Sequence, residues 1–128
     1  MTKEEKSLLL KDLSARLAYG VVYHRNDGAN IKLNAIDVER GLLNYTDDIE
    51  ERECKPYLRS IDDMTEEEEK EICQSMKDYN LLPGPDRAGV FCGEIVEWLN
   101  SHYFDYRGLI EKDLAIEVTE ENNPYASN

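Results

Sequence analysis

Two histidines are the residues of this chain best suited to acid–base chemistry near neutral pH. The 128-residue sequence holds only His24 and His102, and imidazole is the side chain whose ordinary pKa lies in that range. Asp105 follows His102 by three residues, and a nearby carboxylate can orient an imidazole as a general base. One hypothesis is therefore a small enzyme or ligand-binding module that uses His102, Asp105, Tyr106 and Arg107. The structural interpretation, which we favour, is that His102 stabilises a helix end through the helix dipole.

A cluster of aromatic and charged residues surrounds His102. This candidate site consists of Trp98, His102, Tyr103, Asp105, Tyr106 and Arg107. Most clusters of this kind pack a helix end against a sheet, and Asp105 and Arg107 would then form an internal clamp. If the same side chains are exposed, they are suited to anchor a protein interface, because tyrosine, tryptophan and arginine dominate binding hot spots.

The sequence motifs of the common catalytic chemistries are missing from this chain. It has no G-x-S-x-G nucleophile elbow and no glycine-rich nucleotide-binding loop. Its aspartates do not follow the EF-hand spacing. Cys54, Cys73 and Cys92 form no C-x-x-C pair, so we expect reduced thiols rather than a zinc site or a disulfide framework. We predict no catalytic residue, no cofactor and no metal ligand, and a non-enzymatic role is favoured.

The strongest functional signal is negative charge. The chain carries 28 acidic and 15 basic residues, a net charge of −13. Proteins that bind nucleic acid directly usually present a basic face to the phosphates, so direct binding to DNA or RNA is disfavoured. Binding to an anionic membrane surface is disfavoured for the same reason.

The acidic residues are concentrated between Asp47 and Glu71. This segment holds twelve acidic and four basic residues, a net charge of −8 in 25 residues. One interpretation is a solvated surface that keeps the protein soluble. The other is a patch that docks a basic, nucleic-acid-binding protein by charge complementarity, with a DNA mimic as the extreme case. The candidate partner-binding residues are Asp47, Asp48, Glu50, Glu51, Asp62, Asp63, Glu66, Glu67, Glu68 and Glu69.

The first half of the chain is expected to form a helix followed by a small sheet. Thr2 and Glu5 have the spacing of a capping box, and leucines then recur at helical spacing. Asn26-Asp27-Gly28 predicts a tight hairpin between two strands. Four or five short strands over residues 19–58 predict a curled antiparallel sheet or a small SH3-like barrel. Pro56 has no amide proton, so we expect it at a sheet edge or a strand end.

The second half of the chain is expected to be mainly helical. Thr65 and Glu68 form a second capping box ahead of a helix with Ile72 on its apolar face. We then expect a loop at 83–86, a short strand at 90–92, a third helix around 95–103, a final strand at 115–118 and a loose tail over about 120–128.

These elements predict a single α+β domain over residues 1–128. The polar N-terminus is unlike a signal peptide, and no apolar run approaches the roughly 20 residues that span a bilayer. We therefore expect a cytoplasmic protein without membrane contact. Its oligomeric state is not predicted.

Three blocks of sequence resemble a family of small proteins carried by phages and mobile elements of gut anaerobic bacteria. The blocks are Leu9–Leu13 with Arg16–Val21, then Lys55-Pro56-Tyr57-Leu58-Arg59 with Met64–Glu68, and Trp98-Leu99-Asn100 with His102 and Phe104–Ile110. The family typically has proline where this chain has Ala18, and the segments Tyr45–Glu53 and Lys77–Val90 depart from its pattern. No established activity or site residue comes with the resemblance. It implies a setting in a bacterial host where small acidic inhibitors of defence systems are common.

The leading functional hypothesis combines this setting with the charge. It is a non-enzymatic acidic interaction protein, a phage-encoded modulator or inhibitor of a basic, nucleic-acid-binding host protein of the anti-defence or DNA-mimic type. The alternative is the small enzyme or ligand-binding module built on His102, Asp105, Tyr106 and Arg107.

Overall fold

The chain folds into an α+β arrangement with a helix at its start, two small sheets, two further helices and a final strand. The computed structural model describes the backbone of residues 1–78 and 93–125. Helix α1 (Lys3–Arg16) begins at the predicted capping box, in which the backbone amides of Thr2 and Glu5 each donate to the other residue's side chain. The capping-box prediction is therefore confirmed. A short 3-10 turn (Leu17–Tyr19) follows and ends at Gly20, whose φ of 66° favours glycine.

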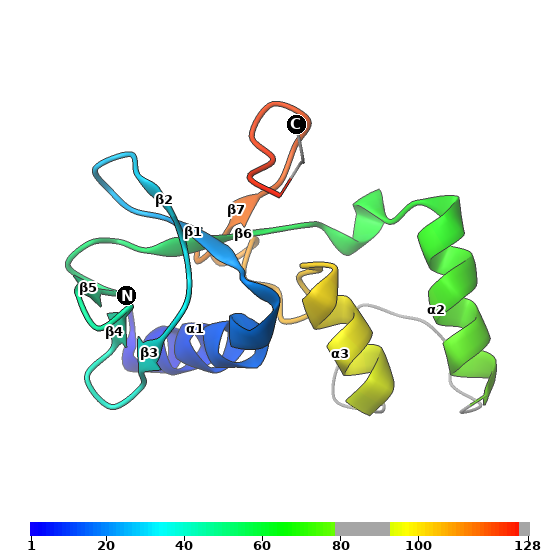
Figure 1. Cartoon of the computed structure of the whole chain (residues 1–128), viewed down its shortest axis with the longest axis horizontal. Coiled ribbons are helices and arrows are strands. Elements are labelled where there is room, and N and C mark those ends of the chain that lie inside the picture. The colour runs from blue at the N-terminus through cyan, green and yellow to red at the C-terminus, as the bar shows by residue number, and fades with distance from the viewer. Residues whose placement is uncertain (79–92, 126–128) are drawn as a thin grey trace.

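The strands form two open sheets (Figure 1). The larger sheet has the order β2-β1-β6-β7, and the smaller has the order β3-β4-β5. Their bounds are β1 Val22–His24, β2 Asn30–Lys32, β3 Ile36–Asp37, β4 Leu42–Leu43, β5 Asp47–Asp48, β6 Lys55–Leu58 and β7 Ile116–Glu117. The predicted turn at Asn26–Gly28 joins β1 to β2, so this hairpin is confirmed. Among these seven strands the pairings are antiparallel except that of β6 with β7, which is parallel.

The SH3-like barrel predicted over residues 19–58 is not confirmed. Neither sheet closes on itself within the described chain. Strand β6 lies between β1 and β7, which is near residue 116, and pairs with none of β3, β4 and β5. Strands of two to four residues are also too short for the tilt and stagger that barrel closure requires. Residues 36–48 instead form the separate three-stranded sheet and its turns.

Pro56 lies in an inner strand but next to its end, as the second residue of β6, whereas the sequence predicts a sheet edge or a strand end. It pairs with Tyr23 of β1, whereas β7 contacts β6 only at Tyr57 and Leu58. Pro56 therefore has a paired strand on one side alone. On its other side no strand residue requires a hydrogen bond from the missing amide proton.

Two helices and a 3-10 turn follow the sheet strand β6. The turn η2 (Ile61–Asp63) leads into α2 (Glu66–Asp78), and α3 (Gly93–Ser101) comes later in the chain. The second capping box is confirmed, because the amide of Thr65 donates to Glu68 and that of Glu68 donates to the Thr65 hydroxyl. The predicted loop at 83–86 and strand at 90–92 lie outside the described residues. No helix in the described ranges has the length and apolar character needed to cross a membrane.

Two hydrophobic clusters hold these elements together. In the larger one, Leu9 and Leu13 of α1 pack against strand residues such as Leu43 and Leu58. The smaller one lies at the other end of the molecule, where Ile72 of α2 meets α3 and Phe104. Figure 1 shows β3, β4 and β5 at one end of the long axis and α2 at the other. Strand β6 runs between the two ends.

The C-terminal segment is anchored at Tyr125, whereas the sequence predicts a loose tail from about residue 120. The Tyr125 hydroxyl accepts the amide of Val22 at 2.9 Å and donates to the carbonyl of Tyr57 at 2.8 Å. Its ring stacks on Tyr103 with centroids 3.7 Å apart. A single aromatic side chain thus joins β1, β6 and the end of the chain.

Candidate functional site

The acidic segment Asp47–Glu71 does not form one continuous face. Its first part lies at β5 and the following turn, and its second part lies at η2 and the start of α2. These two regions are at opposite ends of the molecule, with β6 between them (Figure 1). The ten candidate residues must therefore be judged as two separate groups.

Asp47 is a structural residue rather than a surface one, which corrects its place among the partner-binding candidates. It is only 4% exposed. Its carboxylate accepts the Tyr23 hydroxyl at 2.5 Å and the Arg25 guanidinium at 3.1 Å. Burial, together with the hydrogen bond to Asp47, raises the pKa of Tyr23. The sequence holds no signal for this contact, because Tyr23 and Asp47 are separated by 24 residues.

Asp48 and Glu50 are also engaged within the fold. The Asp48 carboxylate accepts the amides of Glu50 and Glu51 at 3.0 Å each, and these bonds lower its pKa. Glu50 forms an ion pair with Lys6 of α1 at 2.7 Å. Of the candidates in this first group, only Glu51 has an exposed carboxylate without a partner among the described residues.

The second group retains most of its charge at the surface. Five of its six carboxylates are exposed, and no hydrogen bond or ion pair to them is found in the described chain. They belong to Asp62, Asp63, Glu66, Glu67 and Glu69, and we call them the α2 acidic surface. Four carboxylates in the first turn of α2 are also favourably placed with respect to the helix dipole.

Glu68 holds the α2 acidic surface in place. Both of its oxygens accept the Arg59 guanidinium at 2.7 Å, and this ion pair lowers the Glu68 pKa from 4.5 to about 2. The Arg59 guanidinium also lies 4.2 Å from the ring centre of Phe104. Arg59 thereby links α2 to the hydrophobic cluster beneath α3.

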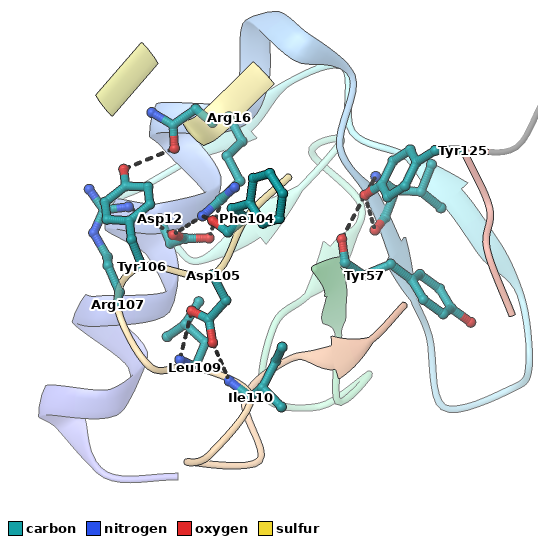
Figure 2. Close-up of polar contacts among 12 residues, drawn as sticks. Asp12, Arg16, Tyr57, Phe104, Asp105, Tyr106, Arg107, Leu109, Ile110 and Tyr125 are labelled. Atoms are coloured by element: carbon teal, nitrogen blue, oxygen red, sulfur yellow. Dashed lines mark hydrogen bonds and ion pairs between the residues drawn. The ribbon is translucent and has the colours of Figure 1, made fainter. Parts of the chain in front are cut away.

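The residues around His102 do not form the imidazole–carboxylate pair that the sequence suggests. His102 stacks on Trp98 at 4.1 Å, and its Nδ1 lies 2.8 Å from the Trp98 carbonyl. The carboxylate of Asp105 instead accepts the amides of Leu109 and Ile110 at 3.0 and 2.9 Å (Figure 2). Asp105 therefore caps a turn, and no carboxylate orients His102 in the described structure.

Arg107 and Tyr106 belong to a buried ionic cluster that the sequence prediction missed. Asp12 binds Arg16 through both oxygens at 2.9 and 3.1 Å, and binds Arg107 at 2.7 Å (Figure 2). Arg16 also donates to the Phe104 carbonyl at 2.6 Å. The two guanidiniums lie 5.3 and 4.6 Å from the centre of the Tyr106 ring. A clamp between aspartate and Arg107 is present, but the aspartate is Asp12 and not Asp105.

A signal for this cluster was present in the sequence. Asp12 and Arg16 are four residues apart, beside the apolar positions of α1. An oppositely charged pair at that spacing meets on one helix face, and its place next to Leu9 and Leu13 indicates burial.

The remaining members of the aromatic cluster are packed as well. The Tyr103 hydroxyl donates to the carbonyl of Tyr19, while its ring stacks on Tyr125. Trp98 stacks on Phe104 with centroids 5.7 Å apart. The cluster thus joins α1, α3 and the C-terminal segment.

Two surface hollows lie on other parts of the protein. One of about 340 Å³ is lined by Cys54, Lys55 and Lys112, among other residues. Burial raises the pKa of the Cys54 thiol to about 12, so this thiol is not ionised at neutral pH. The second, of about 380 Å³, lies between α1 and the β3–β4 turn. Neither is lined by His102, Asp105, Tyr106 or Arg107. In residues 1–78 and 93–125, no three histidine, cysteine, aspartate or glutamate side chains gather as metal ligands would.

Comparison with known proteins identifies no relative of this chain. No family model, curated protein or solved structure matches the chain.

Proposed function

We propose that this chain is a non-enzymatic interaction protein whose α2 acidic surface docks a basic partner. The observation that carries the proposal is the set of five exposed, unpaired carboxylates within residues 62–69, at the start of a helix that Glu68 and Arg59 hold in place. Carboxylates on a helix that is already held in place attract a basic surface without the cost of ordering the backbone on binding.

The class of partner follows from the charge. A surface complementary to these carboxylates is rich in lysine and arginine, as are the faces that bind nucleic acid. We propose a basic, nucleic-acid-binding protein of a bacterial host, with the chain itself acting in the cytoplasm as a phage-encoded modulator of anti-defence or DNA-mimic type. The supporting observations are the net charge of −13 and the resemblance to proteins of phages and mobile elements.

The alternative, a small enzyme or ligand-binding module at His102, has less support. His102 and Asp105 bind different backbone groups, and Arg107 forms an ion pair with Asp12. These side chains converge on neither of the two hollows.

A pull-down from bacterial lysate with the full chain tests the proposal. We expect the immobilised protein to retain a basic protein at low salt and to release it at high salt, since salt screens exposed charges. Added duplex DNA should compete if the partner's nucleic-acid-binding face is the one engaged. Recovery of no partner at low salt would contradict the proposal.

The separation of the two acidic groups provides a matched control. The variant E66K/E67K changes the α2 acidic surface and leaves the Thr65–Glu68 capping box intact. The variant E51K/E53K makes the same change in net charge at the other end of the molecule, where both side chains are exposed. Only E66K/E67K should lose the partner. Equal loss in both variants would show that net charge, and not this surface, determines binding.

A further inference from the structure

The hollow beside α1 carries the opposite charge to the rest of the protein. Three lysines line it, Lys3, Lys6 and Lys11, against the single carboxylate of Glu39. Lys6 already pairs with Glu50 at 2.7 Å. Lys3 and Lys11 are exposed and have no ion pair among the described residues. This chain of net charge −13 thus offers a local site for an acidic ligand.

One face of α1 forms a wall of the hollow. Lys3, Ser7, Leu10 and Ser14 line it at spacings of four, three and four residues, which places them on the same side of the helix. The two serines are small and allow a helix to approach α1 closely. On the opposite wall, Val38 is 54% exposed, and it is one of three large hydrophobic residues exposed in the described chain. A docked helix would bury it.

We propose that this groove receives the acidic start of α2 from a second copy of the chain. The α2 acidic surface supplies five unpaired carboxylates on and just before a helix, which complement the unpaired ammonium groups of Lys3 and Lys11. Within one copy the two surfaces cannot meet, because the groove lies at α1 and the β3–β4 turn while α2 lies at the other end of the long axis (Figure 1).

Such a contact joins two different surfaces, so one copy keeps its acidic surface free and the other keeps its groove free. Contacts of this kind extend into rings or open chains rather than stopping at a symmetric dimer. The proposal rests on the acidic surface of the proposed function, and self-association therefore competes with binding of a basic partner at that surface.

Sedimentation velocity of the purified full chain over a range of concentrations, at low and at high salt, tests the proposal. We expect concentration-dependent association at low salt that is lost at high salt. K3E/K11E and E66K/E67K should each weaken association about tenfold or more, since the first replaces attraction by like-charge repulsion and the second removes most of the negative charge of the acidic surface. Mixing these two variants should restore association, because the unaltered groove of E66K/E67K then meets the unaltered acidic surface of K3E/K11E. Circular dichroism establishes that each variant is folded.

R52E/K112E is the matched control for the groove. It makes the same change in net charge with two exposed side chains that have no ion pair in the described structure and do not line this groove. It should associate like the original chain. A monomer at every concentration and low salt overturns the proposal but leaves the pull-down result of the proposed function standing. Loss of association in E66K/E67K with none in K3E/K11E also overturns it, because the acidic surface then binds a different face.

Discussion

Asp12 and Arg16 form a two-pronged ion pair on α1 whose side chains have no solvent exposure. The same carboxylate binds Arg107, 95 residues later in the chain. One aspartate therefore binds two guanidiniums and ties the first helix to the segment that follows α3. Buried charges are costly unless they are paired, so this cluster should be sensitive to a change of charge.

Replacing Asp12 should destabilise the protein strongly. Asp12→Asn keeps the shape of the side chain but leaves Arg16 and Arg107 without their shared carboxylate. We expect the free energy of unfolding to fall by about 3–5 kcal/mol, the cost of breaking a buried ion pair on one side. Urea denaturation measures it. Asp113→Asn, which removes the partner of Lys55 in a pair with a 90% exposed carboxylate, should cost less than about 1 kcal/mol. A similar small loss for both variants would contradict the structural role of Asp12.

The ion pair between Arg59 and Glu68 should make stability depend on acidic pH. The folded-state pKa of Glu68 is lowered from 4.5 to about 2, chiefly by Arg59. A lowered carboxylate pKa contributes stability that is fully present above the unfolded value and is lost as pH falls toward the folded value. The stability difference between the original chain and Glu68→Gln should therefore be largest above about pH 5 and shrink as pH falls from 4.5 toward 2.

The two hydrogen bonds between Glu68 and Arg59 determine how much stability Glu68→Gln should lose. Hydrogen bonds to charged groups contribute about 1.5–3 kcal/mol, which is the expected loss for Glu68→Gln at neutral pH. Glu67→Gln alters the adjacent exposed carboxylate, which has no partner in the described structure, and should change stability by less than about 0.5 kcal/mol. Denaturation curves at several pH values check both. A constant difference across the acidic range would rule out Glu68 as the titrating group.

The Tyr125 hydroxyl should be needed to hold the C-terminal segment. Tyr125→Phe keeps the stacking on Tyr103 but leaves the Val22 amide and the Tyr57 carbonyl without this partner. We expect a loss of about 1–3 kcal/mol, the cost of leaving buried polar groups unsatisfied. Hydrogen exchange at the Val22 amide should accelerate. Tyr45→Phe is the control, since Tyr45 is 65% exposed, and it should leave both quantities unchanged. Unaltered exchange at Val22 in Tyr125→Phe would contradict the anchoring role.

The sequence by itself determined the local features of this protein. The pairs Thr2–Glu5 and Thr65–Glu68 each lie three residues apart, and both capping boxes form where the spacing predicts them. The Asn26–Gly28 hairpin forms for the same reason. These signals act within one turn of chain, so residue type and spacing are enough to predict them. The excess of negative charge is likewise a property of composition.

Only the tertiary structure decided which of the charges are available at the surface. Asp47 binds Tyr23 and Arg25, and Arg107 binds Asp12, and these partners are 22 to 95 residues apart in the sequence. The place of β7 beside β6 and the anchoring of Tyr125 depend on equally distant partners. Which distant groups meet depends on how all the elements pack together, and no local spacing encodes it. The residue types alone are enough to predict the acidity. Which carboxylates are buried, which are paired within the protein and which are exposed depends on the fold.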